Sequence, residues 1–330
     1  MTTVLFVRLS AMGDLVQGLG AIAALHAVRP QWRLRVVTQT TFAPLLAGLP
    51  SIADVVTFDR RGGLRAVLAT RAAMRREPND VAIDLQGNWK SALLARLAGA
   101  RDCLGIERAW RQEAGSAWLL RRCIAASGVP HPATAALALV RAVAPEASVT
   151  LPRLVAAAPE LERERAALQQ LGVDAARPFR VVVVTDPVDA RALRAAHVRA
   201  LTADRDMPCV HLFGPAESHL PAAEGVPSVR HVPGEVRRLV ALGELVQRAG
   251  GEVAGPDQGA SHVLAAAGAR CRVWFGAMDP LRTAPPGAVA RVHPAPPPCS
   301  PCGSARCRNA AGVVCMEFAT PSASGVTQTP

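Results

Sequence analysis

The chain has 330 residues, half of them apolar, and a formal net charge of +11. This length exceeds one ordinary hydrophobic core and predicts two domains of roughly 150 residues each. No apolar run approaches the roughly 20 residues of a membrane-spanning helix. The N-terminus also lacks a basic segment followed by a long apolar stretch, so we expect no signal peptide and a cytoplasmic protein.

The positive charge comes almost entirely from arginine. Lys90 is the one lysine among 37 basic residues, and the chain has no tyrosine. The arginines are scattered and not interleaved with aromatic residues, so we expect no nucleic-acid partner. Phosphorylated small molecules or an anionic membrane surface suit such a diffuse arginine excess better.

Strands and helices alternate in the first half of the sequence. Apolar runs predict strands at 3–8, 34–37, 55–58 and 81–85. Apolar periodicity predicts helices at 15–28, 42–47 and 64–76, and a further helix that follows the turn at 86–91 and ends at residue 98. This alternation is typical of βαβ units and a parallel sheet. Residues 128–157 contain scattered prolines and small residues, which indicate a linker and close a first domain at 1–157.

The alternation restarts after a charged helix at 161–171. Strands are predicted at 180–184, 208–213 and 271–275, and helices at 188–203, 235–249 and from residue 260 onward. The second domain therefore spans 158–318, and the fold class is α/β. Residues 319–330 have the composition of a disordered tail.

Three turns follow predicted strands, at 9–14, 86–91 and 255–259. In open α/β sheets, ligands bind at the carboxyl ends of the strands. The Gly255–Gly259 turn leads into a helix N-terminus, where backbone N–H groups favour a phosphate. Asp257 is expected to cap this helix or to accept a hydrogen bond from a hydroxyl or amide, whereas His262 is either a ligand contact or a packed helix residue.

Three segments together resemble the heptosyltransferase family of GT-B glycosyltransferases, glycosyltransferase family 9, which builds the inner core of lipopolysaccharide. They are Val7-Arg8-Leu9-Ser10-Ala11-Met12-Gly13-Asp14, then Ile83-Asp84-Leu85-Gln86-Gly87 with Lys90-Ser91, and finally Gly255-Pro256-Asp257-Gln258-Gly259 with His262 and Phe275-Gly276…Asp279-Pro280. The segments occur in the family's order and spacing over residues 4–282.

The resemblance implies two Rossmann-like domains whose parallel sheets face an inter-domain cleft, with the acceptor in the first domain and an ADP-sugar in the second. It further implies an inverting, metal-independent transfer of heptose from ADP-heptose to an acceptor hydroxyl, in lipopolysaccharide core or related glycan synthesis. Such a reaction needs a base for the hydroxyl proton, and Asp14 matches the family's proposed base. From the residues alone, a helix cap is the favoured interpretation of Asp14.

The remaining site predictions combine the resemblance with the positions and charges of single residues. Donor binding falls to Gly13, Arg191, Arg194, Gly255, Asp257, Gln258, Gly259 and His262. We expect the acceptor, a phosphorylated glycan or glycolipid, to be bound by Arg60, Arg61, Gln86 and Lys90. The protein would also contact the inner membrane peripherally. Solvated surface charge is the alternative interpretation of these basic residues.

One segment departs from the family pattern. After the strand at 180–184 the family carries a small-residue loop and then a lysine that approaches the phosphates, but here Thr185-Asp186-Pro187-Val188-Asp189 follows and no lysine is present. Arg191 or Arg194 would have to supply the positive charge. An alternative hypothesis is therefore a degenerate, non-catalytic GT-B-like protein that binds a nucleotide or a partner.

Four of the eight cysteines cluster near the C-terminus, at Cys299, Cys302, Cys307 and Cys315. Four thiolates at such spacing are suited to a structural Zn²⁺ or iron ion, although reduced free thiols and disulfides remain alternatives. No cofactor is expected to be required for catalysis. The cysteines also permit a zinc-dependent nucleic-acid binder, which leaves the two βαβ domains unexplained.

Overall fold

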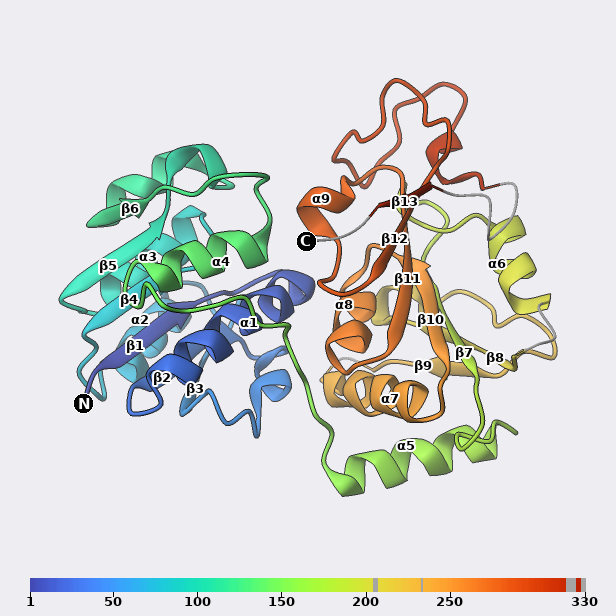
Figure 1. Ribbon diagram of the computed structural model, residues 1–330, viewed down its shortest axis with the longest axis horizontal. Coiled ribbons are helices and arrows are strands. Elements are labelled where there is room, and N and C mark those ends of the chain that lie inside the picture. Colours follow the sequence, from blue (N-terminus) through green and yellow to red (C-terminus); the bar gives the residue numbers. More distant parts are fainter. Residues whose placement is uncertain (204–206, 233, 319–324, 328–330) are drawn as a thin grey trace. The chain divides into compact units, whose positions relative to one another are not determined.

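The computed structural model describes residues 1–203, 207–232, 234–318 and 325–327. The chain divides into two compact units, Met1–Pro152 and Arg153–Pro330, slightly before the boundary predicted at residue 157. Each unit has a sheet of mostly parallel strands with helices packed against it (Figure 1). The predicted α/β fold class with two Rossmann-like domains is therefore confirmed.

The first unit contains a six-stranded parallel sheet in the order β3-β2-β1-β4-β5-β6. Its strands are β1 (Thr3–Val7), β2 (Arg33–Gln39), β3 (Asp54–Phe58), β4 (Val81–Asp84), β5 (Asp102–Ile106) and β6 (Arg122–Ile124). Its α-helices are α1 (Met12–Val28), α2 (Gly63–Met74), α3 (Trp89–Leu97) and α4 (Pro132–Arg141), and its 3₁₀ helices are η1 (Ala43–Leu46), η2 (Arg108–Trp110) and η3 (Ala114–Leu119).

Helices α2 and α3 cover one face of this sheet. Alternate residues of β1, Leu5 and Val7, share a buried cluster with Ala66 of α2 and Leu94 of α3, as the two-residue side-chain period of a strand requires. Helices α1 and α4 pack against each other and lie in front of the sheet in Figure 1, with α2 behind it. The candidate base, Asp14, lies where β1 ends and α1 begins.

The second unit contains a seven-stranded sheet in the order β13-β12-β11-β10-β7-β8-β9, parallel except for β13. Its strands are β7 (Arg180–Val184), β8 (Cys209–Phe213), β9 (Ser228–Arg230), β10 (Glu252–Pro256), β11 (Arg270–Phe275), β12 (Val289–Val292) and β13 (Gly325–Thr327). Its helices are α5 (Ala158–Gln170), α6 (Ala195–Ala203), α7 (Val236–Arg248), α8 (Gly259–Ala266) and α9 (Pro280–Thr283), with the 3₁₀ helices η4 (Pro215–Glu217) and η5 (Val314–Met316).

The strand order makes β7, β10 and β11 neighbours, so the loops that follow them meet at one edge of the sheet. Two glycines allow close approach there. A Cβ on Gly255 would lie 2.8 Å from Cβ of Val183, and one on Gly276 would lie 2.6 Å from the carbonyl oxygen of Cys315. Both positions therefore need glycine for the packing of this edge.

Three expectations about secondary structure are corrected. The helix predicted at 188–203 begins only at Ala195, because Asp186 and Asp189 each accept a backbone N–H two residues ahead, from Val188 and Arg191, and hold a turn instead. The linker predicted at 128–157 contains α4, whose apolar face packs on α1.

The third correction concerns the predicted tail at 319–330. Residues 325–327 form β13, which pairs antiparallel with β12, because an edge strand offers unpaired backbone groups to an adjacent segment. Residues 319–324 and 328–330 lie outside the described residues. None of the helices in the described part of the chain combines the length and apolar character needed to span a bilayer.

Candidate active site

Asp14 lies in the first turn of α1, directly after the carboxyl end of β1. Its Oδ2 accepts the backbone N–H of Ala11 at 3.3 Å and forms an ion pair with the guanidinium of Arg8. The Asp14 side chain is 26 % exposed, whereas that of Arg8 is 5 % exposed. The carboxylate is thus oriented from the buried side and still accessible to a ligand. Gly13, assigned to donor binding, is buried in the same turn.

Gln86 braces the loop that carries Asp14. Its Oε1 accepts the N–H groups of Leu9 at 2.8 Å and Ser10 at 3.2 Å, and its Nε2 donates to Oγ of Ser10 at 3.1 Å. The side chain is buried. The amide of Gln86, which is predicted to contact the acceptor, is thus hydrogen-bonded to the loop that carries Asp14.

A buried ion pair in turn holds Gln86. Oδ1 of Asp84 accepts the N–H groups of Gln86 at 3.0 Å and Gly87 at 3.1 Å. Oδ2 of Asp84 pairs with Nη2 of Arg111 at 2.5 Å, and both side chains are 0 % exposed. Arg111 also donates to Oγ of Ser116 at 2.8 Å. The charges therefore satisfy each other without water, which is the condition for burying them.

The other acceptor candidates are exposed basic side chains at the same edge of the first sheet. Arg60 and Arg61 follow β3, and Lys90 lies in the first turn of α3. Asn88 caps α3 by accepting the N–H of Ser91 at 3.0 Å. The sheet topology thus brings these cations to the edge that carries Asp14 without fixing their orientation.

The loop after β7 contains a compact ion pair. The carboxylate of Asp189 accepts hydrogen bonds from Nε of Arg191 at 2.9 Å and from Nη2 at 2.6 Å. Burial alone would raise the pKa of Asp189, but the hydrogen bonds and charge of Arg191 outweigh it and hold the pKa below its ordinary value. The hydrogen bond with Asp189 raises the pKa of Arg191. The charge expected to meet phosphate is therefore neutralised within its own loop.

Arg194 is also engaged locally. It donates to the carbonyl oxygens of Ala192 at 2.8 Å, Asp189 at 3.1 Å and Pro187 at 3.3 Å. Burial lowers the pKa of its guanidinium. Arg194 thus stabilises the shape of the loop rather than presenting a charge to the surface.

Asp257 and His262 form a buried pair beside this loop. His262 Nε2 lies 3.1 Å from Oδ1 of Asp257, so the cap of α8 is not Asp257 but Gln258, whose side chain makes no capping hydrogen bond. The Gln258 amide donates to Asp189 at 3.5 Å. These contacts bring the donor candidates together around the N-terminus of α8, where backbone N–H groups and the helix dipole favour a phosphate. Gly255 and Gly259 border this site in sequence.

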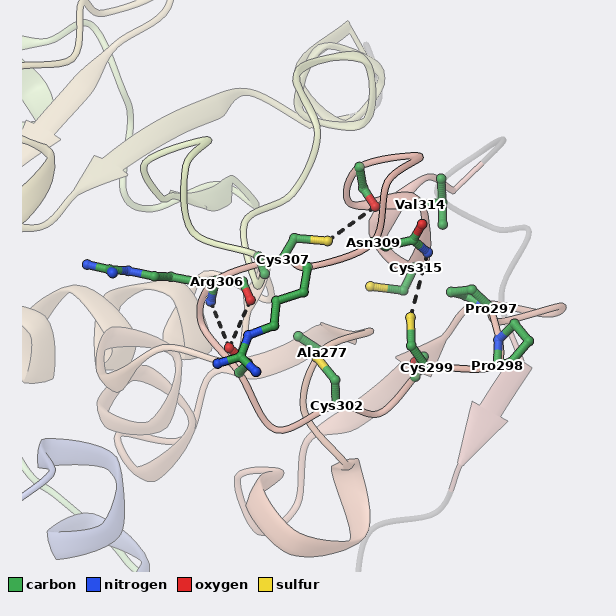
Figure 2. A pocket seen from close by; sticks show the side chains of 15 residues that line it. Ala277, Pro297, Pro298, Cys299, Cys302, Arg306, Cys307, Asn309, Val314 and Cys315 are labelled. Carbon is green, nitrogen blue, oxygen red and sulfur yellow. Dashed lines mark hydrogen bonds between the residues drawn. The ribbon is translucent and has the colours of Figure 1, made fainter.

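Figure 2 shows the four clustered cysteines around one cavity of about 520 Å³, with Cys299, Cys302 and Cys307 exposed and Cys315 buried. Burial, and then the charges of the other three cysteines, raise the pKa of Cys315. Among the residues described, however, no three potential ligands are arranged to hold a metal ion. The cavity gathers the right donor atoms, but they do not stand at coordination geometry.

The segment that carries the four cysteines is hydrogen-bonded to the loops that follow β7 and β11. Ala190 donates its N–H to the carbonyl of Ala305 at 2.9 Å, and Gly303 donates to that of Ala277 at 2.7 Å. Ser300 Oγ donates to the carbonyl of Gly276 at 2.6 Å. The cavity therefore borders the loops that follow β7 and β11 in the second unit.

Sequence reasoning missed the roles of Arg8, Asp84, Arg111 and Asp189. Arg8 and Asp84 stand in the segments that carry the family resemblance, which was an available signal. Arg111 lies 27 residues from its partner Asp84 and is one arginine among many, so no sequence pattern singles it out.

Comparison with known proteins identifies the family. The family model for glycosyltransferase family 9 (heptosyltransferase) matches residues 67–311. No curated protein sequence matches the chain. A glycosyl transferase family 9 structure from Veillonella parvula is similar, with a TM-score of 0.74 and 14% identity over 88% of this chain and 85% of that one.

Two Escherichia coli structures are similar as well. Heptosyltransferase WaaC with ADP-2-deoxy-2-fluoro heptose gives a TM-score of 0.68 and 21% identity over 88% of this chain and 92% of that one. ADP-heptose lps heptosyltransferase II gives a TM-score of 0.68 and 18% identity over 89% and 92%. The family model covers most of the sequence and the fold agrees with GT-B heptosyltransferases, so the chain belongs to glycosyltransferase family 9 and is a glycosyltransferase.

Proposed function

We propose that this glycosyltransferase moves a heptose from ADP-heptose to an acceptor hydroxyl, with inversion, in lipopolysaccharide core or related glycan synthesis. The observation that carries the proposal is Asp14, a carboxylate oriented by Arg8 and left partly exposed at a strand end. The likeness to WaaC bound to an ADP-heptose analogue supports the choice of donor.

In the proposed reaction, Asp14 takes the proton of the acceptor hydroxyl while the hydroxyl oxygen attacks the anomeric carbon. The bond between that carbon and the donor phosphate oxygen breaks, and ADP leaves with the electron pair. Attack from the side opposite ADP inverts the anomeric centre. Arg8, and Gln86 through the 9–10 loop, keep the Asp14 carboxylate in one orientation, which is the contribution of positioning to the rate.

The donor site would use the N-terminus of α8 for the diphosphate, because its first-turn N–H groups suit an anion. Arg191 would add positive charge once its guanidinium turns from Asp189 toward phosphate, and Arg194 would hold the loop. Asp257 and His262 would meet the nucleoside. Gly13, Gly255, Gln258 and Gly259 remain predicted donor contacts.

Arg60, Arg61 and Lys90 are proposed to contact phosphates of a glycan or glycolipid acceptor, because cationic side chains at the edge that carries Asp14 suit anionic groups. The reaction would then take place in the cytoplasm at the inner membrane. Lys90 and the two arginines belong to different helices and loops, so they would contact different parts of the acceptor.

We also propose that Cys299, Cys302, Cys307 and Cys315 hold a structural zinc or iron ion, which the transfer chemistry does not require. Thiolate sulfur is a soft donor suited to these metals, and all four residues line one cavity. The thiols would have to move to reach coordination geometry. Elemental analysis of purified protein tests this: one bound metal per chain, lost on substitution of Cys302 by serine, supports the site, and a metal-free native protein rejects it.

The central experiment replaces Asp14 with asparagine, which keeps the shape but removes the base. We expect transfer from ADP-heptose to fall by roughly 10²–10⁴-fold, the usual contribution of a general base. The rise in Tm produced by ADP should persist, since ADP at 100 times its Kd adds about 2.7 kcal/mol of stability. UDP and GDP should produce less.

Asp102→Asn is the matched control, because Asp102 is also a carboxylate paired with an arginine and is 27 % exposed. This variant should keep full transfer. Undiminished transfer by the Asp14 variant would remove Asp14 from the mechanism. ADP binding without transfer by the native protein, across glycolipid acceptors, would instead indicate the non-catalytic alternative.

A further inference from the structure

Helices α2 and α3 expose large apolar side chains away from the sheet. Leu64 and Leu68, in the first two turns of α2, are 73 % and 55 % exposed, and Trp89 and Leu93, in the first two turns of α3, are 47 % and 40 % exposed. The two helices contact each other and share the buried cluster beneath them. These side chains therefore lie on one outer layer of the first unit.

The 3₁₀ helix η3 extends this layer. It contacts α3, and the ring of Trp89 lies over Gly115, where an added Cβ would come within 2.9 Å of it. Trp118 of η3 is 76 % exposed, and the guanidinium of Arg108 stacks on its ring at 4.6 Å. We call the exposed outer side of α2, α3 and η3 the α2–α3 surface.

The charged side chains of helices α2 and α3 are all basic. Residues 60–76 contain six arginines and no acidic residue, and residues 89–101 contain Lys90, Arg96 and Arg101 and no acidic residue. Acidic side chains at its border are fewer than these cations: Asp59 accepts the N–H of Arg61 at 2.9 Å, Glu113 accepts that of Trp89 at 2.6 Å, and Asp80 pairs with Arg101 at 3.9 Å. A ligand would therefore meet apolar groups within a cationic field.

We propose that the α2–α3 surface is a docking site for an anionic lipid bilayer. Leucines and tryptophans that emerge among arginines are the composition of helices that lie in the membrane interface, where the apolar groups enter the acyl boundary and the cations meet anionic headgroups. Tryptophan is enriched at that depth because its ring is apolar and its N–H is polar.

The position of the surface in the fold explains why lipid suits it better than nucleic acid. In parallel βα units each helix begins at the carboxyl edge of the sheet, so the first turns of α2 and α3 lie at the edge that carries Asp14. A glycolipid acceptor would rise from the bilayer at this edge. Trp89 and Trp118 have rings on which a base can stack, but Leu64 and Leu68, the large exposed apolar side chains of α2, do not. All four side chains suit the membrane interface.

This inference deepens the proposed function by naming the surface that would meet a glycolipid's membrane, but its test needs neither donor nor acceptor. The full-length protein is sedimented with vesicles that contain phosphatidylglycerol and, separately, with vesicles of phosphatidylcholine alone. We expect binding to the anionic vesicles that weakens as salt rises, because the arginine contribution is screened, and much weaker binding to the neutral ones.

Two double variants separate the apolar and cationic contributions. Leu64→Gln/Leu68→Gln should lower the vesicle partition coefficient by more than about tenfold, because two leucine side chains no longer leave water. The matched control is Leu151→Gln/Leu171→Gln, which removes two leucines that are 59 % and 39 % exposed elsewhere. This control should leave the partition coefficient within about twofold of the native value.

Arg65→Gln/Arg76→Gln should lower partition by roughly 10- to 30-fold, from about 1 kcal/mol for each arginine near an anionic surface. Both residues are exposed, and neither is assigned to acceptor or donor binding. Arg163→Gln/Arg165→Gln on α5 changes the net charge equally and should have little effect. The ADP-induced rise in Tm should be the same in all four variants, which shows that fold and donor site are intact.

Three results would overturn the proposal. The native protein could fail to bind anionic vesicles, or both control pairs could weaken binding as much as the test pairs. Alternatively, a single-stranded oligonucleotide could displace the vesicles while the leucine variants bind normally, which would assign the surface to nucleic acid. Loss of ADP binding with vesicle binding retained would contradict the proposed function and leave this inference standing.

Discussion

The two units use charged side chains at their strand ends in opposite ways. In the first unit, Arg111 and Asp84 are fully buried and satisfy each other, and their hydrogen bonds lead through Gln86 to the loop that presents Asp14. In the second unit, Asp189 and Arg191 pair within one loop and are 18 % and 28 % exposed. One ion pair is part of the core, and the other lies at the edge of the candidate ligand site.

The difference in burial determines what each ion pair can do. A fully buried pair is costly to break, because removing one partner leaves an uncompensated charge away from water. It can therefore fix a catalytic loop in one conformation. A partly exposed pair contributes little to stability, so it can be exchanged for a ligand at low cost. We expect the first pair to control folding and orientation and the second to control donor affinity.

The largest effect should follow from Arg111→Leu. The substitution strands the Asp84 carboxylate in the core, and breaking such a pair typically costs about 3–5 kcal/mol of the free energy of unfolding. Urea denaturation measures the loss. The matched control is Arg177→Leu, whose partner Asp174 is 63 % exposed at 3.6 Å and whose loss should cost under about 1 kcal/mol. Equal effects in both variants would remove the distinction between a buried and a surface pair.

A smaller effect should follow from acid, through the core of the second unit. His197 is 2 % exposed and packs edge-on against Trp274 at 4.8 Å, and neither of its ring nitrogens has a hydrogen-bond partner among the described residues. Burial, and secondarily the charge of Arg272, lower the pKa of His197 to about 4. The folded protein therefore keeps this imidazole neutral at a pH where the unfolded chain protonates it.

The sign of the pH dependence follows from linkage. Between pH 6.5 and 4 the unfolded chain binds a proton that the folded state does not, so stability falls as the pH falls through this window. The contribution of His197 amounts to about 3 kcal/mol by pH 4. His197→Phe should flatten the pH dependence of urea denaturation by this amount. An unchanged slope in the phenylalanine variant would show that His197 takes up its proton in the folded state.

Much of this organisation was predictable from the sequence. Continuous apolar runs such as Val4–Val7 and Val181–Val184 identify buried parallel strands, and the glycine and aspartate turns after them identify the ligand edges. The helix α4 is not predicted, because small residues such as Ala136 have the composition of a linker. Its burial depends on Leu139 and Val140, which are both buried in the structure. A buried strand is identified by its own residues, whereas this helix is identified only by the contacts that bury it.

The remaining features depend on contacts between residues far apart in the sequence. Gln86 is 77 residues from Leu9, so its hydrogen bonds to the loop that carries Asp14 have no local signature. Apolar periodicity predicts a helix from residue 188, but Asp186 and Asp189 hold turns with their side chains and delay the helix to Ala195. In both places a polar side chain takes backbone hydrogen bonds that sequence periodicity does not reveal.

The smallest effect should come from Asp189→Asn, which tests whether the exposed ion pair is exchangeable. The variant keeps the size of the side chain but removes the charge that neutralises Arg191, so the guanidinium becomes available to a diphosphate. We expect ADP to bind roughly five- to tenfold more tightly, on the order of 1 kcal/mol, as measured by calorimetry at low salt. Asp186→Asn is the control, because that carboxylate pairs with His219 at 3.2 Å, and it should change affinity less than twofold. If ADP binding weakens in the Asp189 variant instead, the carboxylate orients Arg191 for phosphate. The pair would then be a fixed part of the donor site, organised like the buried pair of the first unit.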